Sequence, residues 1–156
     1  MATAHVNIGS NIGDRRAQIE LAVTRIMERF GRSVRRSGYV DSAPWGYDSP
    51  NRFLNLGLAL ETGDMEPLEI LRLLREVETS INPASHRTAS GEYADRVIDI
   101  DLIAVDDMVL NTPELTLPHP RMHLRAFVLE PLAELAPAWR HPLLHLTARQ
   151  LRELLD

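Results

Sequence analysis

The chain of 156 residues contains no cysteine. Disulfides, thiolate metal sites and a cysteine nucleophile are therefore excluded, and any bound metal must be held by aspartate, glutamate or histidine. The sequence also lacks a basic N-terminal region followed by an apolar run, and no segment reaches transmembrane length without charges. We therefore expect a cytoplasmic protein with no membrane partner.

Positive charge is scarce as well, since the formal net charge is −5. Phosphate backbones are attracted by basic surfaces, so this balance disfavours a general nucleic-acid binder. The remaining composition, 44% hydrophobic and 25% charged residues, is ordinary for a folded protein and argues against disorder. With no internal repeats or low-complexity segments, the length predicts a single domain over residues 1–156.

The periodicity of the apolar residues predicts the main helices. Spacings of three and four indicate helices over residues 14–30 and 68–81, with Asp14 as a suitable N-cap for the first and Pro67 at the start of the second. The expected apolar stripe of the second helix is Leu68, Leu71, Leu74 and Ile81. Leucines at helical spacing predict a further short helix over residues 146–155.

Alternating apolar residues predict strands over 5–10, 53–61 and 96–105, and residues 33–39 have some strand character. The order strand, helix, strand, strand, helix, strand resembles the split βαβ pattern of ferredoxin-like folds. We therefore expect an α+β sandwich, a mainly antiparallel sheet with helices packed on one face. Gly9-Ser10-Asn11, which lacks the phosphate-loop pattern, is interpreted as a turn.

Two acids interrupt the β-branched segment RVIDIDLIAV, residues 96–105. Side chains two apart in a strand share a face, so Asp99 and Asp101 point away from their apolar neighbours. Their Cα atoms would lie roughly 6.5 to 7 Å apart, a spacing at which two carboxylates reach a pair of Mg²⁺ ions about 3.5 to 4 Å apart. From the spacing alone, a solvated strand face explains the two acids equally well.

Basic residues surround this segment. Arg96 precedes the acids, and LPHPRMHLR adds His119, Arg121, His123 and Arg125. Arginine forks bind phosphate bidentately, and histidine donates to phosphate oxygens or acts as acid or base. Metal-binding acids together with these cations indicate a polyphosphate ligand, although Arg121 and His123 are more simply explained as a surface arginine and a turn histidine.

Flat and amphipathic side chains lie elsewhere in the chain. The rings of Trp45, Phe53 and Phe127 are able to sandwich a planar heterocycle, and the carboxamide of Asn55 is able to pair with its edge, with core packing and a surface asparagine as the simpler alternatives. Glu78 falls at the edge of the second helix's apolar stripe, where spacing favours a solvated position over one turned toward a site.

Four segments in a fixed order, GSNIGD, SAPWGY…FLN, DRVIDIDLI and LPHPRMHLRAFVLEPLAELAP, resemble the 6-hydroxymethyl-7,8-dihydropterin pyrophosphokinases (2-amino-4-hydroxy-6-hydroxymethyldihydropteridine diphosphokinases) of folate biosynthesis. The resemblance runs nearly from end to end. It implies transfer of an intact pyrophosphate from ATP, the co-substrate, to the hydroxymethyl oxygen of the pterin, with release of AMP. Attack then takes place at the β-phosphorus, and two Mg²⁺ ions are the implied cofactors.

The resemblance also assigns residues to roles. It makes Asp99 and Asp101 the ligands of the two Mg²⁺ ions. It places Arg96, His119 and Arg125 at the phosphates and Thr116 with the Leu102 backbone at the nucleoside. It stacks Phe53 and Phe127 on the pterin, whose edge is read by Asn55 and the backbone of Ser42, Ala43, Pro44 and Trp45.

Residues 82–96, NPASHRTASGEYADR, depart from the common form of the family, which carries R-x-R and W-G-P-R there. Arg87 is the expected closing-loop contact to ATP, with His86 as the alternative, and Tyr93 stands where a tryptophan is expected. Glu78 matches a family acid on the ATP side whose role stays open. In the family this loop and the one around Trp45 close over the substrates and exclude water.

The expected protein is thus a monomeric, cytoplasmic pterin pyrophosphokinase whose partners are ATP and the pterin. Two other classes stay open. A ferredoxin-like regulatory domain that binds a heterocycle without reacting it would have no use for Asp99 and Asp101. A metal-dependent phosphohydrolase would use those acids but would not need an aromatic clamp for a second planar substrate.

Overall fold

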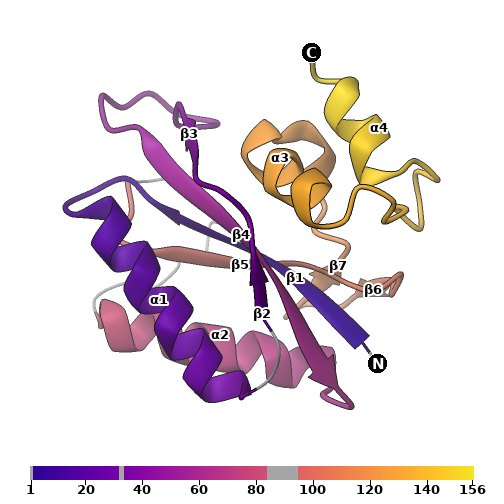
Figure 1. Ribbon diagram of the computed structural model, residues 1–156, viewed down its shortest axis with the longest axis horizontal. Coiled ribbons are helices and arrows are strands. Elements are labelled where there is room, and N and C mark those ends of the chain that lie inside the picture. The colour runs from indigo at the N-terminus through magenta and orange to yellow at the C-terminus, as the bar shows by residue number, and fades with distance from the viewer. Residues whose placement is uncertain (1, 32–33, 84–94) are drawn as a thin grey trace.

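The computed structural model describes residues 2–31, 34–83 and 95–156 (Figure 1). Its main sheet has the order β2-β4-β1-β5, with β3 also paired to β4, and every pairing is antiparallel. The strands are β1 (Ala2–Ser10), β2 (Val34–Arg36), β3 (Val40–Ser42), β4 (Phe53–Gly63) and β5 (Asp99–Val105). The two helices that follow β1 and β4 complete the ferredoxin-like arrangement, so the expected α+β fold class is confirmed.

Helices α1 (Arg15–Phe30) and α2 (Pro67–Ile81) cover one face of this sheet (Figure 1). Asp14 caps α1 by accepting a hydrogen bond from the Ala17 N–H at 3.1 Å. The helix ends at Gly31, whose left-handed φ of 58° costs a glycine little. Both ends therefore lie where the sequence predicts them, and Pro67 opens α2 as expected. The core beneath the two helices is built from alternate strand residues, among them Val6, Ile8, Leu56, Leu58, Leu60, Ile100 and Leu102, together with Ile98 just before β5.

Helix α3 (Ala126–Leu135) packs on the opposite face, which we call the α3 face, and α4 (Ala148–Glu153) packs on α3 (Figure 1). The expectation that the helices share one face is therefore wrong. Residues 126–135 are apolar almost throughout and contain Pro131, so they show no helical stripe from which a packing side could be predicted. A second core forms here from Ile103, Ala104, Met122, Val128, Leu129, Leu132, Ala148 and Leu151.

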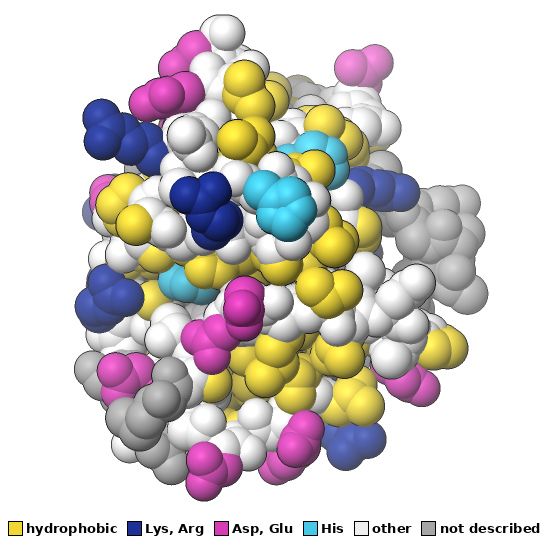
Figure 2. All heavy atoms as spheres, turned by 90° about the vertical axis from the view of Figure 1, so that its right-hand side faces the viewer, with side chains coloured by type: hydrophobic (Ala, Val, Ile, Leu, Met, Phe, Trp, Pro, Cys, Tyr) yellow, Lys and Arg dark blue, Asp and Glu magenta, His cyan; other side chains and the backbone are white. Residues whose placement is uncertain are grey.

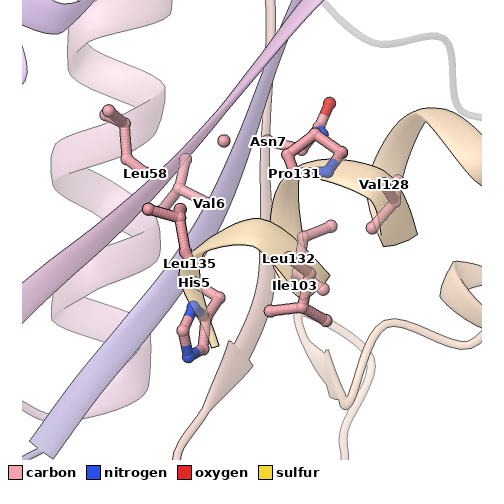
Figure 3. A pocket seen from close by; sticks show the side chains of 10 residues that line it. His5, Val6, Asn7, Leu58, Ile103, Val128, Pro131, Leu132 and Leu135 are labelled. Carbon is pink, nitrogen blue, oxygen red and sulfur yellow. The ribbon is translucent and has the colours of Figure 1, made fainter. Parts of the chain in front are cut away.

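The contact between α3 and the sheet is close. A Cβ atom added to Gly57 would lie 2.6 Å from the Cβ of Pro131, so only glycine allows α3 to approach β4 this closely. Figure 3 shows His5 and Asn7 of β1 on one side of this interface and Val128 and Leu132 of α3 on the other. The space left between them is about 10 Å³, hardly room for one water molecule. This packing positions the start of α3 beside the site described below.

The C-terminal half of the chain also contains two short strands, β6 (Leu110–Asn111) and β7 (Thr116–Leu117), and the short 3₁₀ helix η1 (Met122–Leu124). On the face shown in Figure 2, apolar side chains are interspersed with basic, acidic and histidine side chains. Scattered exposed apolar residues of this kind are normal on a protein surface. Within the described ranges, each helix is too short or too polar to cross a membrane.

Candidate active site

The two acids of β5 lie on the α3 face of the sheet. Ile98, Ile100 and Leu102 between and beside them are buried in the opposite core, so alternation turns Asp99 and Asp101 the other way. Across the strand pair, Asp99 is opposite a glycine of β1, Gly9, and Asp101 is opposite Asn7. Both aspartates are half-buried. The structure thus places the two carboxylates on one face, as the spacing predicts.

Glu78 of α2 holds β5 from the side. Its Oε2 accepts a hydrogen bond from the Ile100 N–H at 2.7 Å, and Arg75 donates to the Ile100 carbonyl at 2.6 Å and to Glu78 at 3.1 Å. The Glu78 side chain is only 3% exposed, so the expected solvated position is wrong. The helix is rotated so that Ile70, Leu74, Val77 and Glu78 face inward. The Glu78 side chain is buried against β5 because the backbone of this strand needs hydrogen-bond partners on the side away from β1.

A polar cavity of about 240 Å³ adjoins Asp101. It brings together four of the predicted site residues: Asp101, Leu102, Thr116 and His119. Its other lining residues are Leu71, Arg75, Thr112, Pro113, Glu114, Leu115 and Pro120. Arg75 is a site residue that sequence reasoning missed; its position three residues before Glu78, on the same side of the helix, was the available signal.

His119 is oriented by its own turn. Its backbone N–H donates to the Ile103 carbonyl at 2.8 Å, and its Nδ1 accepts a hydrogen bond from the Arg121 N–H at 3.2 Å. An imidazole that accepts at Nδ1 carries its proton on Nε2 in the neutral form. The donor end of the ring is therefore Nε2. His123 packs edge-on against His141, with ring centroids 6.5 Å apart, as suits a turn histidine.

Arg125 connects α3 with the loop that follows β3. It sits at the N-cap position of α3 and is only 7% exposed. The guanidinium carbon lies 4.7 Å from the ring centroid of Trp45 and 5.6 Å from that of Phe127, within the range of cation–π attraction. The structure thus gathers one predicted phosphate contact and two predicted pterin contacts at one point.

Asn55 and Phe53 lie over Gly9 on the same face. A Cβ added to Gly9 would lie 3.0 Å from the Asn55 Oδ1 and 3.4 Å from the Phe53 ring, so the absence of a side chain makes room for both. The amide of Asn55 donates to the Ser42 hydroxyl at 2.8 Å. The local sequence predicts a turn at Gly9, but this prediction is wrong: Gly9 lies inside β1, where a glycine signals a close approach of other groups.

Ala43, Pro44 and Arg96 are three further predicted contacts that the structure describes. Pro44 is half-buried and Ala43 exposed, and Arg96 lies just before β5 with its backbone paired to that of Asn11. Arg87, with its alternative His86, lies outside the described residues, as does Tyr93. In the described part of the chain, three or more histidine or acidic side chains do not come together as a metal site. Asp99 and Asp101 remain the predicted donors.

Paired carboxylates beside a polar cavity, with cationic side chains around it, are typical of metal-dependent phosphoryl-transfer enzymes. Comparison with known proteins identifies the particular family. The model of the 7,8-dihydro-6-hydroxymethylpterin-pyrophosphokinase family matches residues 5–137. The chain belongs to this family, as its motifs predict. It is therefore a pyrophosphoryl transferase of folate biosynthesis, with hydroxymethyldihydropterin and ATP as its substrates.

Curated relatives agree over most of their length. A 2-amino-4-hydroxy-6-hydroxymethyldihydropteridine pyrophosphokinase of Porphyromonas gingivalis is 38% identical over 144 residues, 91% of this chain and 95% of that protein. The enzyme of the same name from Bacillus subtilis is 33% identical over 133 residues, 85% of this chain and 77% of that protein.

Among solved structures, wild-type HPPK-DHPS of Plasmodium falciparum has a TM-score of 0.76 at 15% identity, over 98% of this chain and 44% of that chain. Another HPPK-DHPS structure, in complex with substrates, has a TM-score of 0.74 at 13% identity. This chain spans less than half the length of those solved chains, and at such low identity the likeness supports the fold alone.

Proposed function

We propose that the chain transfers an intact pyrophosphate from MgATP to the hydroxymethyl oxygen of 6-hydroxymethyl-7,8-dihydropterin, with AMP as the second product. The observation that carries this proposal is the convergence of Asp101, Leu102, Thr116 and His119 on one cavity. It lies beside the sheet face on which Asp99, Asn55 and Phe53 are found. The two substrates would thus have separate places, one on each side of the acids.

Asp99 and Asp101 are suited to hold two Mg²⁺ ions. Magnesium prefers oxygen ligands, keeps several waters and is commonly bound by one or two carboxylates together with substrate phosphates. Two half-buried aspartates fit that donor set, and in the described ranges no third histidine or acid is grouped with them as a metal site. When bound, the ions would offset the charge of the phosphates and favour deprotonation of the acceptor hydroxyl.

The nucleotide would lie in the cavity of about 240 Å³. Thr116 and the backbone of Leu102 would hold the nucleoside. The phosphates would then extend toward Arg96, His119 and Arg125. His119 would donate from Nε2, because its Nδ1 already accepts the Arg121 N–H. We infer that Glu78 serves ATP indirectly, by holding the backbone of β5 between the two acids.

The pterin would be stacked by the rings of Phe53 and Phe127. Its donor and acceptor edge would meet the Asn55 amide and the backbone of residues 42–45, since Asn55 and Ser42 are hydrogen-bonded to each other at 2.8 Å. Both rings are half-buried and so keep part of their surface available. A pterin held in this way would already have its hydroxymethyl group oriented for attack. Little further orientational entropy would then be lost during the reaction.

We further propose a monomeric, cytoplasmic enzyme, formed as one domain by residues 1–156, whose partners are these two small molecules. A net charge of −5 supports the proposal that neither nucleic acid nor a membrane surface is a partner.

The test is to mix the protein with MgATP and hydroxymethyldihydropterin and identify the nucleotide product. We expect AMP and the pterin diphosphate in equal amounts, with no AMP when the pterin is omitted. Formation of ADP, or nucleotide cleavage that does not depend on the pterin, would contradict the proposal. The first result indicates ordinary kinase chemistry and the second a hydrolase.

A further inference from the structure

A single carboxylate, that of Asp95, receives hydrogen bonds from four side chains. Its Oδ1 accepts from the Asn11 amide at 2.8 Å and from the Tyr47 hydroxyl at 2.8 Å. Its Oδ2 accepts from the Ser49 hydroxyl at 3.1 Å and from the Asn51 amide at 2.8 Å. These donors come from two segments distant in sequence: Asn11, directly after β1, and residues 43–52 between β3 and β4, which we call the 43–52 loop.

Asn11 extends this cluster to the entrance of β5. Its Oδ1 accepts a hydrogen bond from the Arg96 N–H at 2.6 Å, and its backbone N–H donates to the Arg96 carbonyl at 3.0 Å. Its amide nitrogen also donates to the Tyr47 hydroxyl at 3.1 Å and to the Asn51 carbonyl at 3.2 Å. Asn11 is 3% exposed, so its bonds are shielded from water.

The charge state of the cluster is well defined. The hydrogen bonds from Asn51 and then Tyr47 lower the pKa of Asp95 to about 2. Desolvation, followed by the hydrogen bond to Asp95, raises the pKa of Tyr47 to about 12. At neutral pH Asp95 is therefore ionised and Tyr47 protonated, and the bonds between them are of the stronger, charge-assisted kind.

The position of Asp95 in the chain gives this cluster its importance. The 43–52 loop begins with three of the residues proposed to read the pterin edge, and its Trp45 contacts Arg125. On the other side, Asp95 directly precedes Arg96, a proposed phosphate contact, at the entrance to the strand of Asp99 and Asp101. One carboxylate thus joins the proposed pterin side of the site to the proposed phosphate side.

We propose that Asp95 is a positioning residue that holds the 43–52 loop in place for the pterin and couples that loop to the strand bearing the phosphate and metal contacts. This rests on the function proposed above. Asp95 itself touches neither substrate. When the carboxylate becomes an amide, the charge is lost and one of the two acceptor oxygens becomes a donor, so the loop moves away from the β5 entrance and binds the pterin less tightly.

The first measurement is independent of turnover. Hydrogen–deuterium exchange of the full chain compares wild type with Asp95→Asn and with Tyr47→Phe, which removes one donor and disturbs the fold least. Asp48→Asn, an exposed acid of the same loop, is the matched control. We expect faster exchange over residues 43–52 in Asp95→Asn, a smaller change in Tyr47→Phe, and none in the control. Unchanged exchange in Asp95→Asn would overturn the proposal.

The second measurement distinguishes a residue that positions the loop for the pterin from one that only stabilises the fold. Binding of hydroxymethyldihydropterin is titrated with and without Mg²⁺ and an ATP analogue whose α and β phosphates are joined by a methylene group. For Asp95→Asn we expect pterin affinity to fall about tenfold, equivalent to about 1.4 kcal/mol. Affinity for the analogue should change less than about threefold, and the effect of the bound analogue on pterin affinity should shrink.

The proposal would be overturned if affinity fell equally for both ligands, or if the melting temperature fell while pterin affinity stayed unchanged. Either result would show that Asp95 only stabilises the fold. Neither binding nor exchange depends on product formation. Failure of the wild-type protein to make AMP would therefore contradict the proposed function. The role of Asp95 would still be decided by the exchange and binding measurements.

Discussion

The side-chain amide of Asn7, on β1, donates a hydrogen bond to the backbone carbonyl of Phe127 at 2.9 Å. This bond anchors the first turn of α3 to the middle of the sheet. Asn7 is also the residue opposite Asp101 in the strand pair. The aromatic ring proposed for the pterin is therefore placed relative to a proposed metal ligand through one side chain, in addition to the packing of α3.

Replacement of either acid by its amide tests the metal role. We expect Asp99→Asn and Asp101→Asn each to lower turnover at least about a thousandfold, since ligand loss removes about 4 kcal/mol of charge stabilisation in the transition state. The fold should be retained, because neither side chain belongs to the core. AMP formation and thermal unfolding measure the two effects. Asp107→Asn, in the exposed turn after β5, is the control. Near-normal activity of either variant with Mg²⁺ and ATP would show the role to be wrong.

Removal of the Phe127 ring should weaken binding of the pterin more than binding of ATP. Stacking of a heterocyclic base on an aromatic side chain is worth about 1–3 kcal/mol by alanine substitution, so Phe127→Ala should weaken pterin binding by about tenfold or more. The change in ATP affinity should stay within about twofold. Calorimetric titration measures both, and Leu124→Ala, an exposed residue before α3, is the control. Equal weakening for the two ligands would count against stacking.

Loss of the Glu78 carboxylate should destabilise the protein. Glu78→Ala leaves the Ile100 N–H without this acceptor and removes the acid beside Arg75, which we expect to cost about 2–3 kcal/mol in the free energy of unfolding. Glu78→Gln should cost less, since an amide oxygen still accepts from Ile100. Urea unfolding measures the differences. Glu76→Ala removes an exposed acid from the same helix and should stay within about 0.5 kcal/mol of wild type. A similar effect at the two positions would contradict the structural role of Glu78.

His5 should make stability depend on pH. Burial, and then the positive charge of Arg35, lower its pKa from 6.5 to about 4, and it is 5% exposed. Between these values the unfolded chain binds a proton that the folded protein does not, so stability rises with pH over this window. The stability that the protein gains from keeping His5 neutral is fully present above about pH 6.5, and it is lost as the pH falls toward 4. At about 1.36 kcal/mol per pKa unit, it amounts to about 3 kcal/mol.

Unfolding by urea at several pH values measures this effect. His5→Gln should flatten the pH dependence between pH 6.5 and 4, whereas His145→Asn, at an exposed position with positive φ that asparagine tolerates, should keep it. Identical curves for wild type and His5→Gln would show that another group is responsible.

The features that were predictable from the sequence depend on local patterns. The ends of α1 follow from Asp14 and Gly31, and the shared face of Asp99 and Asp101 follows from the period of a strand, whatever lies around them. Features that depend on distant neighbours were not predictable. Glu78 is buried because β5 lies beside α2 and offers its backbone there, and this pairing spans 22 residues.

Dependence on distant neighbours also explains the other features that the sequence did not predict. Gly9 precedes a serine and an asparagine, so its local sequence suggests a turn, whereas in the fold it pairs with Asn55 of β4 and Asp99 of β5. The continuous apolar character of residues 126–135 gave no indication of a packing side. The cluster around Asp95 combines residues 11, 47, 49, 51 and 95, whose separation conceals any common role.

The contact between α2 and β5 has one more consequence, for self-association. Among the described strands, β5 borders only β1, so its outer side is an edge of the sheet at which a strand from another molecule is able to pair. At the centre of this edge, Glu78 and Arg75 occupy both the N–H and the carbonyl of Ile100. An incoming strand would find neither a donor nor an acceptor there and would meet two charged groups. The residues that hold the proposed metal strand in place would therefore also disfavour edge-to-edge pairing with another molecule.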